Sequence, residues 1–561
     1  MKQHRVQSAI LIKILFIFIS MMCITMFLSF ESIAAAGAAA GAATGAATGA
    51  TTGAADQESK KEIDPHDIVF MSATELAWKI QSRQITSVEV VDAYLAQIAK
   101  YNGKLNAIVT LDIEGARQRA IEADAAIARG EIWGPLHGVP ITIKDNIAVA
   151  GMKTTSSLPA LANYVPDFDA PVVLRLRKAG AIIIGKTNLP VFAMDIQTNG
   201  PVFGRANNPW DLERTPGGSS GGAAAALAAG LTALDIGNDL GGSIRIPSHF
   251  CGIYGLKPTE YMVPKLGVFP GYPLPDMPKP EFNAWRYLVY QGPLARSIDD
   301  LKLALTIIAG PHPDEPLVPL VNLDRPREKE LKNLRIAWTD DFGGVPVTAD
   351  TKEAMKNLAD KLEKQGCRVE KLNPTGFDFT LAWKTYNDIF DLQIGPYTPS
   401  YARFLQYVLG GSIRKKMGLG EMVIPQTYEK FLRALTQRDQ LTATMEKFVG
   451  QYDAFLCPVT ASSAFRHIAP DGYVPPLNFP YYTKPVLIDD KPQTYMAANM
   501  AYTTIFNLTG NPVVIIPIGY SKEGMPIGVQ IVGKHWRDME LLTVAKQIDG
   551  VSGAFKHPPG Y

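Results

Sequence analysis

One stretch, Arg214 to Thr259, most constrains what this chain can fold into. It reads RTPGGSSGGAAAALAAGLTALDIGNDLGGSIRIPSHFCGIYGLKPT, and two glycine-serine clusters, Gly217–Gly222 and Gly241–Ser243, flank a run of alanine and leucine. The run Ala223–Gly230 carries helix-forming residues without charge, so it predicts a buried helix. Leu231–Ile236 then predicts a short buried strand. Because glycine lets the backbone approach a ligand closely, we expect serines on these turns to be held rigidly and to remain reachable.

Other interpretations exist for each serine cluster. GGSSGG alone is typical of a flexible linker, and GGS alone of a turn, but a linker would not be followed by a dry helix. The cluster also matches G-x-S-x-G, the nucleophile elbow, with Ser220 at its centre. That motif should follow a strand, and Glu213–Pro216 does not resemble one. It also needs a downstream histidine with an aspartate partner, and no such pattern is evident.

A lysine follows the apolar segment Val139–Ile143, which predicts a short β-branched strand. Lys144 stands at the end of this strand, followed by Asp145 and Asn146. Taken alone, Lys144 would be assigned to the surface, because lysine is rarely buried without a partner. Helices that alternate with short strands along the chain predict an α/β architecture.

Composition excludes several classes of protein. Of the 561 residues, 47% are hydrophobic and 19% charged, which is ordinary for a globular protein. The net charge of +1 gives no argument for nucleic acid or an anionic membrane as partner. The four cysteines form neither a disulfide framework nor a zinc-binding spacing. We therefore expect neither a metal nor an organic cofactor.

The N-terminal region differs from the rest in composition. A basic start precedes an apolar run and then small residues, which predicts a signal peptide or signal anchor over residues 1–36. Residues 37–62 are largely alanine, glycine and threonine and predict a low-complexity linker, since they offer little to bury. Residues 63–561 are expected to form the catalytic domain. These features predict a protein that is exported, periplasmic or secreted, or membrane-anchored through its N-terminus.

A set of motifs in this order resembles the amidase signature family of serine hydrolases. Besides Arg214–Thr259, the motifs are GVPITIKDN, NPW, GPLARSIDDL, FNLTGNP and GMPIGVQIVG, and they span roughly Ile68 to Asp549. The resemblance implies one α/β/α domain with a mixed, twisted central sheet covered by helices. It also implies a serine–serine–lysine triad: Ser243 as nucleophile, Ser219 as bridging serine with a cis peptide, and Lys144 as base.

Further site residues follow from the same resemblance. The backbone N–H groups of Leu240, Gly241, Gly242 and Ser243 are expected to form the oxyanion hole, because consecutive amides in a glycine-rich turn can point at one spot. The resemblance assigns supporting roles to Ser220, Asp239 and Arg245. The chain departs from the family where the family often has Gly-Thr-Asp, since here it reads Gly237-Asn238-Asp239.

The expected function is an amidase that hydrolyses a non-peptide carboxamide to a carboxylic acid and ammonia or an amine through an acyl-enzyme. Its expected partner is a small-molecule amide, with a membrane tether through the N-terminus and no nucleic acid; a homodimer or another oligomeric state stays open. Two alternatives remain. One is an amidotransferase A-type subunit, which hydrolyses glutamine and supplies ammonia to a partner; the predicted export signal argues against it. The other is an inactive binding protein, against which the retained Lys144, Ser219 and Ser243 argue.

Overall fold

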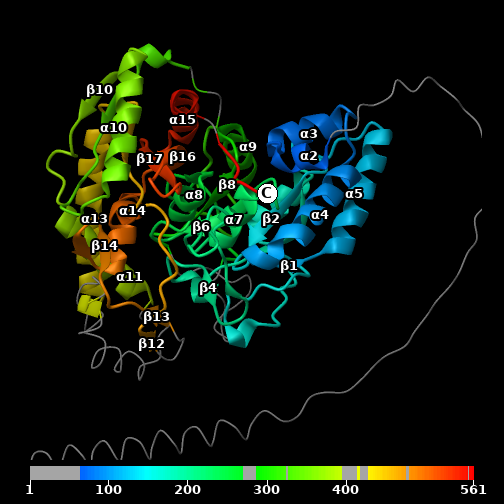
Figure 1. The fold of residues 1–561 in the computed structure, drawn as a ribbon, viewed down its shortest axis with the longest axis horizontal. Helices are drawn as coiled ribbons and strands as arrows, with labels where there is room; N and C mark the ends of the chain where they lie inside the picture. Colours follow the sequence, from blue (N-terminus) through cyan, green and yellow to red (C-terminus); the bar gives the residue numbers. More distant parts are fainter. Residues whose placement is uncertain are drawn as a thin grey trace, which may run out of the picture. The chain divides into compact units, whose positions relative to one another are not determined.

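The computed structural model describes residues 64–268, 286–323, 326, 328–394, 414–416, 427–474, 479–553 and 555–561. The predicted signal segment and the predicted linker lie outside these residues, and the proposed domain boundaries stay predictions. The described residues form a mixed α/β fold around one eleven-stranded sheet (Figure 1). Its order is β1-β3-β2-β6-β8-β7-β16-β17-β11-β9-β10. The strands of this sheet are β1 (Ile108–Leu111), β2 (Pro140–Lys144), β3 (Ile182–Thr187), β6 (Asp235–Asp239), β7 (Tyr254–Lys257), β8 (Tyr290–Ala295), β9 (Arg335–Trp338), β10 (Arg368–Lys371), β11 (Ala454–Pro458), β16 (Val513–Tyr520) and β17 (Pro526–Val532).

Helices and short hairpins surround this sheet. The α-helices are α2 (Pro65–Phe70), α3 (Ala73–Gln81), α4 (Ser87–Leu105), α5 (Ile113–Ala128), α6 (Pro171–Lys178), α7 (Gly221–Ala228), α8 (Arg245–Cys251), α9 (Ile298–Ile308), α10 (Ala349–Lys364), α11 (Phe379–Ile394), α13 (Tyr428–Val449), α14 (Tyr495–Thr509) and α15 (Asp538–Ser552). The 3-10 helices are η1 (Pro159–Leu161), η2 (Val191–Ala193) and η3 (Leu331–Asn333). The hairpin strands are β4 (Asn199–Gly200) with β5 (Gly204–Arg205), β12 (Gly472–Val474) with β13 (Phe479–Tyr481), and β14 (Val486–Ile488) with β15 (Lys491–Gln493).

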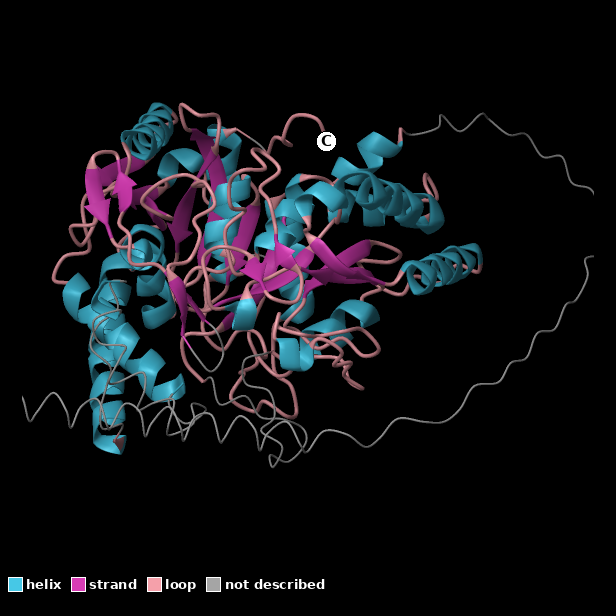
Figure 2. Cartoon of the chain, turned by 60° about the horizontal axis from the view of Figure 1, so that its bottom comes forward, coloured by secondary structure: helices cyan, strands magenta, loops and turns pink. Residues whose placement is uncertain are grey.

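Both faces of the sheet are covered, as alternation along β16 demonstrates. Val514 and Ile516 belong to a hydrophobic cluster with residues of α10 and α15, whereas Val513 and Ile515 belong to a second cluster with residues of α11, α13 and α14. Successive side chains of a strand point to opposite faces, so the two clusters lie on opposite sides of the sheet. Figure 2 shows the strands running between helices on either side. The predicted α/β/α fold with a mixed central sheet is therefore confirmed.

The parallel strands β2 and β6 are adjacent, with Thr142 opposite Asp235. Strand β6 begins at Asp235 rather than at Leu231, where the apolar pattern predicts its start. The chain first turns after α7, because Gly230 has a φ of +72° and the Leu231 N–H donates back to Ala226. The strand continues through polar residues that the sheet buries. Its C-terminal end therefore places polar side chains beside the end of β2.

Candidate active site

Lys144 is the last residue of β2, and its side chain is fully buried. Its Nζ donates to Ser219 Oγ at 2.7 Å and to Asn238 Oδ1 at 2.9 Å. Burial lowers the pKa of Lys144 to about 7, although the carboxylates of Asp239 and Asp235 oppose the shift. A lysine with this pKa loses its proton readily near neutral pH, which is the property a general base needs.

Ser219 lies in a tight turn that leads into α7. The Gly218–Ser219 peptide bond is cis, and Gly217 has a φ of +85°. A Cβ atom at Gly218 would lie 2.7 Å from the carbonyl oxygens of Asp195 and Ile196, so only glycine fits there. Helix α7 is buried along its whole length, as its uncharged sequence predicts. The first serine cluster is therefore a fixed part of the core and not a linker.

Ser243 lies in the loop between β6 and α8. Its backbone carbonyl accepts from the Ser220 N–H at 3.1 Å, which joins the two serine clusters. Ser243 is partly exposed, whereas Ser219 and Lys144 are buried. Among the described residues no hydrogen bond joins the Ser243 hydroxyl to Ser219. The structure thus brings the three predicted residues into one region, and the proton path between the two serines remains a matter of proposal.

The N–H groups of the Ser243 loop differ in their partners. The Gly242 N–H, one of the four predicted oxyanion donors, already donates to Asp239 Oδ1 at 2.8 Å. Within the described part of the chain, the N–H groups of Leu240, Gly241 and Ser243 have no hydrogen-bond acceptor. Buried or half-buried N–H groups are rarely left without a partner. These three donors are the ones that remain available to a ligand.

Asp239 and Arg245 form a buried ion pair that holds this loop. Arg245 Nη2 lies 2.8 Å from Asp239 Oδ1, and both side chains are fully buried. Arg245 also donates to the Asn507 and Gln530 side chains and to the Thr503 carbonyl. Burial opposes ionisation of Asp239, but the charge and hydrogen bonds of Arg245 and Asn507 hold its pKa well below the usual range. The pair is therefore charged, and it fixes the start of α8.

Sequence reasoning missed three of these contacts. Asn507 and Gln530 lie on α14 and β17, and Asn238 contacts Lys144 directly. A signal existed, because Asn507 stands in the FNLTGNP motif and Gln530 in GMPIGVQIVG. Both motifs carry the family resemblance, but the sequence alone assigns them no role in the site.

Arg245→Leu should lower the free energy of unfolding by about 3–5 kcal/mol, because it leaves the Asp239 carboxylate buried without its cation. Thermal and urea denaturation would measure the change. Arg117→Leu is the matched control, since it breaks the Arg117–Asp92 pair, which has the same 2.8 Å separation but has both side chains about half exposed. Equal melting curves for the two variants would contradict the structural role assigned to Arg245.

Ser220 occupies a supporting position. Its hydroxyl donates to the Asn238 carbonyl at 3.4 Å, and it is the residue from which α7 begins. The elbow interpretation fails on two grounds: no strand directly precedes Ser220, and among the described residues no histidine is hydrogen-bonded to it. His249, for example, contacts the Ser462 carbonyl and the Gly528 N–H instead.

A second buried lysine lies on the adjacent strand. Lys186 of β3 donates to the Ile147 carbonyl at 2.8 Å and to Thr154 Oγ1 at 2.9 Å, and burial lowers its pKa to about 8. Asp235 accepts from Thr142 at 2.6 Å, and burial raises its pKa to about 7. Of the two buried lysines on β2 and β3, Lys144 is the one that contacts a serine of the glycine-rich turns.

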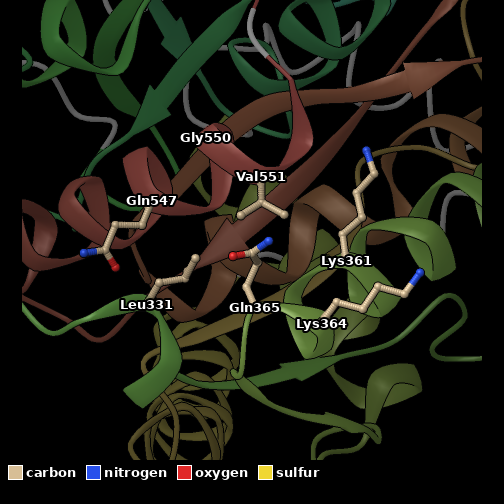
Figure 3. A pocket seen from close by; sticks show the side chains of 7 residues that line it. All are labelled: Leu331, Lys361, Lys364, Gln365, Gln547, Gly550 and Val551. Atoms are coloured by element: carbon tan, nitrogen blue, oxygen red, sulfur yellow. The ribbon is translucent and has the colours of Figure 1, made fainter.

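A surface pocket of about 530 Å³ lies elsewhere, at the ends of α10 and α15 (Figure 3). Its lining includes Lys361, Lys364, Gln365 and Gln547, and none of its lining residues belongs to the elements that carry Lys144, Ser219 or Ser243. In the ranges that the structure describes, no group of three or more histidine, cysteine, aspartate or glutamate side chains is arranged to hold a metal ion.

Comparisons with known proteins agree with this arrangement. A profile of the family described as Amidase matches residues 89–542. The A-type component of the glutamyl-tRNA(Gln) amidotransferase of Alkaliphilus metalliredigens (strain QYMF) is 33% identical over 489 residues, which cover 85% of this chain and 95% of that protein. The solved structure of 6-aminohexanoate cyclic dimer hydrolase with substrate is 26% identical, with a TM-score of 0.68 over 88% of this chain and 99% of that one. A bacterial aryl acylamidase of the amidase signature family shares the fold, with 23% identity, a TM-score of 0.73 and coverage of 87% and 97%.

One prediction from the sequence is wrong. Export or membrane anchoring was inferred from composition at residues 1–36, and it conflicts with relatives that are components of a glutamyl-tRNA(Gln) amidotransferase. A basic start before an apolar run fits a signal in composition alone, and those residues lie outside the described part of the chain. No helix among the described residues has both the length and the apolar character needed to cross a membrane. The predicted signal peptide and membrane tether are therefore unsupported.

The long family match and the identity to these relatives settle the class of the protein. The chain belongs to the amidase signature family, and it is an enzyme that hydrolyses carbon–nitrogen bonds of amides.

Proposed function

We propose that this enzyme hydrolyses a carboxamide through a covalent intermediate on Ser243, with Lys144 as general base and Ser219 between them. The observation that carries the proposal is the 2.7 Å contact between the buried Lys144 Nζ and Ser219 Oγ. A pKa of about 7 leaves a large fraction of Lys144 neutral at neutral pH, so it can accept a proton.

In the proposed first half-reaction, Ser243 Oγ attacks the carbonyl carbon of the amide. The Ser243 proton passes to Ser219 Oγ, and the Ser219 proton passes to Lys144 Nζ. The carbonyl oxygen becomes an oxyanion that accepts hydrogen bonds from the N–H groups of Leu240, Gly241 and Ser243. Such a donor typically lowers the barrier by about 2.7–4 kcal/mol. The carbon–nitrogen bond then breaks, and the proton returns through Ser219 to the leaving nitrogen.

In the second half-reaction, water replaces the amine. Lys144 takes a proton from this water through Ser219, and the resulting hydroxide attacks the ester carbon on Ser243. The ester bond breaks, the carboxylic acid leaves, and Ser243 regains its proton. Gly242 is a weaker candidate for the oxyanion hole, since its N–H is engaged by Asp239. Asp239 and Arg245 support the loop that carries the donors.

The identity of the amide has two candidates. The curated relatives favour an amidotransferase A-type subunit, which would release ammonia from glutamine and pass it to partner subunits. With the predicted export signal unsupported, the main objection from sequence to this role is gone. Likeness to a hydrolase of a cyclic amide supports a self-sufficient amidase as the second candidate. The amidotransferase role is the better supported of the two.

A panel of glutamine, aliphatic, aryl and cyclic amides should separate the candidates. We expect ammonia release from glutamine to exceed release from the other amides if the chain belongs to an amidotransferase, because its pocket then fits one amino acid. Ammonia and amine are measured for the wild type, with Ser243→Ala as the blank. Rapid hydrolysis of aryl or cyclic amides with no glutamine turnover would instead establish a self-sufficient amidase. No turnover above the blank on any amide would count against both candidates.

A further inference from the structure

Asn238 is the only side chain besides Ser219 whose hydrogen bond to Lys144 is described among these residues. Its Oδ1 lies 2.9 Å from Lys144 Nζ, and its backbone carbonyl lies 3.5 Å from the same atom. Asn238 is the fourth residue of β6 and is 5% exposed. At this position the chain departs from the Gly-Thr-Asp sequence that its family often has, so the contact is a feature of this chain.

A second amide fixes the orientation of Asn238. Its Nδ2 donates to Asn146 Oδ1 at 2.8 Å, and Asn146 lies two residues after Lys144. The two ends of an asparagine amide differ, because the nitrogen only donates and the oxygen only accepts. With the nitrogen engaged by Asn146, the oxygen is turned toward Lys144. A hydroxyl at this position could both donate and accept, so it would orient the amine less strictly.

The hydrogen inventory of Lys144 gives this orientation a consequence. A neutral amine has two N–H groups and one lone pair. Both N–H groups can point to Asn238, toward Oδ1 at 2.9 Å and the carbonyl at 3.5 Å. The lone pair is then directed at the third neighbour, Ser219 Oγ, 2.7 Å away. A base in this rotamer is ready to accept the Ser219 proton without first turning.

We propose that Asn238, held by Asn146, is a positioning residue that turns the lone pair of Lys144 toward Ser219. This inference rests on the proposed roles of Lys144, Ser219 and Ser243. The other charged groups that face Lys144 are the carboxyl groups of Asp235 and Asp239 on β6. Neither is hydrogen-bonded to Lys144 Nζ in the described structure, because Asp235 is engaged by threonines and Asp239 by Arg245.

The rate of covalent labelling by a fluorophosphonate, measured against pH, tests the proposal without knowledge of the natural substrate. Asn238→Leu removes the acceptor and keeps the size. The plateau rate at high pH, where Lys144 is neutral in every variant, should fall by about 10- to 100-fold, because a misplaced catalytic group loses that much. Asn146→Leu releases the clamp, and its plateau should fall between those of Asn238→Leu and the wild type.

Asn238→Asp separates orientation from packing. A carboxylate oxygen accepts as the amide oxygen did, so the plateau should stay near the wild-type rate. The added negative charge stabilises protonated Lys144, so the acid limb should move up by about 1–3 pH units. A merely structural role would lower the plateau in Asn238→Asp and Asn238→Leu alike, and would leave the limb in place.

Gln97→Leu is the matched control, since it removes a buried amide on α4 that bonds the Ala229 carbonyl and does not contact the triad. Its pH profile should equal that of the wild type, and thermal melting would establish that all variants are folded. A wild-type plateau in folded Asn238→Leu would overturn the positioning role. Labelling that persists in Ser243→Ala would instead overturn the proposed function itself, so the two failures are distinguishable.

Discussion

Ser243→Ala is expected to abolish fluorophosphonate labelling and to lower kcat for amide hydrolysis by about 10⁴–10⁶-fold, since no other group can carry the acyl intermediate. The loop itself should persist. The Ser243 backbone carbonyl still accepts from Ser220, and the Asp239–Arg245 pair does not involve the Ser243 side chain. Labelling detected by intact mass, together with ammonia or amine release, would measure the loss.

Ser248→Ala provides the matched control for this change. Ser248 is a buried serine on α8, and its hydroxyl donates to the Ile244 carbonyl at 2.8 Å. It should label at the wild-type rate. If Ser243→Ala were labelled and active like this control, the nucleophile would have to be another residue.

Lys144→Met should lower kcat/KM by about 10²–10⁴-fold, the usual contribution of a general base. In the wild type, Lys144 accepts a proton as pH falls through its pKa of about 7, and the protonated amine has no lone pair for Ser219. The rate should therefore rise with pH up to about 7 and level off above it, with about a tenfold loss for each pH unit below. Lys144→Met should lack this limb. The pH–rate profiles of kcat/KM for both proteins would measure it.

Lys186→Met is the control for removing a buried ammonium group. Lys186 is as deeply buried as Lys144, but it donates to Ile147 and Thr154 and not to a serine of the glycine-rich turns. It should melt at a lower temperature and keep the acid limb near pH 7. A limb that vanished in Lys186→Met and survived in Lys144→Met would reassign the base.

The sequence contained the parts of the site that are local. Lys144, Ser219 and Ser243 each stand beside a recognisable element: the end of a β-branched strand or a glycine-rich turn. Periodicity could not place the start of β6 at Asp235, because this strand buries polar residues that an apolar pattern does not reveal. Nor could it find the Asn238–Lys144 contact, which depends on the pairing of β6 with β2.

Composition was least informative at the N-terminus and for long-range partners. The apolar run before Phe30 fits a signal in hydropathy, and hydropathy alone does not report the destination of a protein. The partners of Arg245 lie 258–285 residues further along the chain, at Thr503, Asn507 and Gln530. Spacing rules describe neighbours on one helix or strand, so they carry no information about such contacts.

The distance along the chain between Arg245 and its partners also bears on synthesis. Lys144, Ser219 and Ser243 are all made before residue 244, whereas α14, which supplies Thr503 and Asn507, comes about 260 residues later. At about 5–20 residues per second, the ribosome needs roughly 13–52 s to span that interval. During this time the growing polypeptide carries a serine, a bridging serine and a base, but the nucleophile loop has not yet met the groups that lock it. Completion of the site is thus coupled to near-completion of translation.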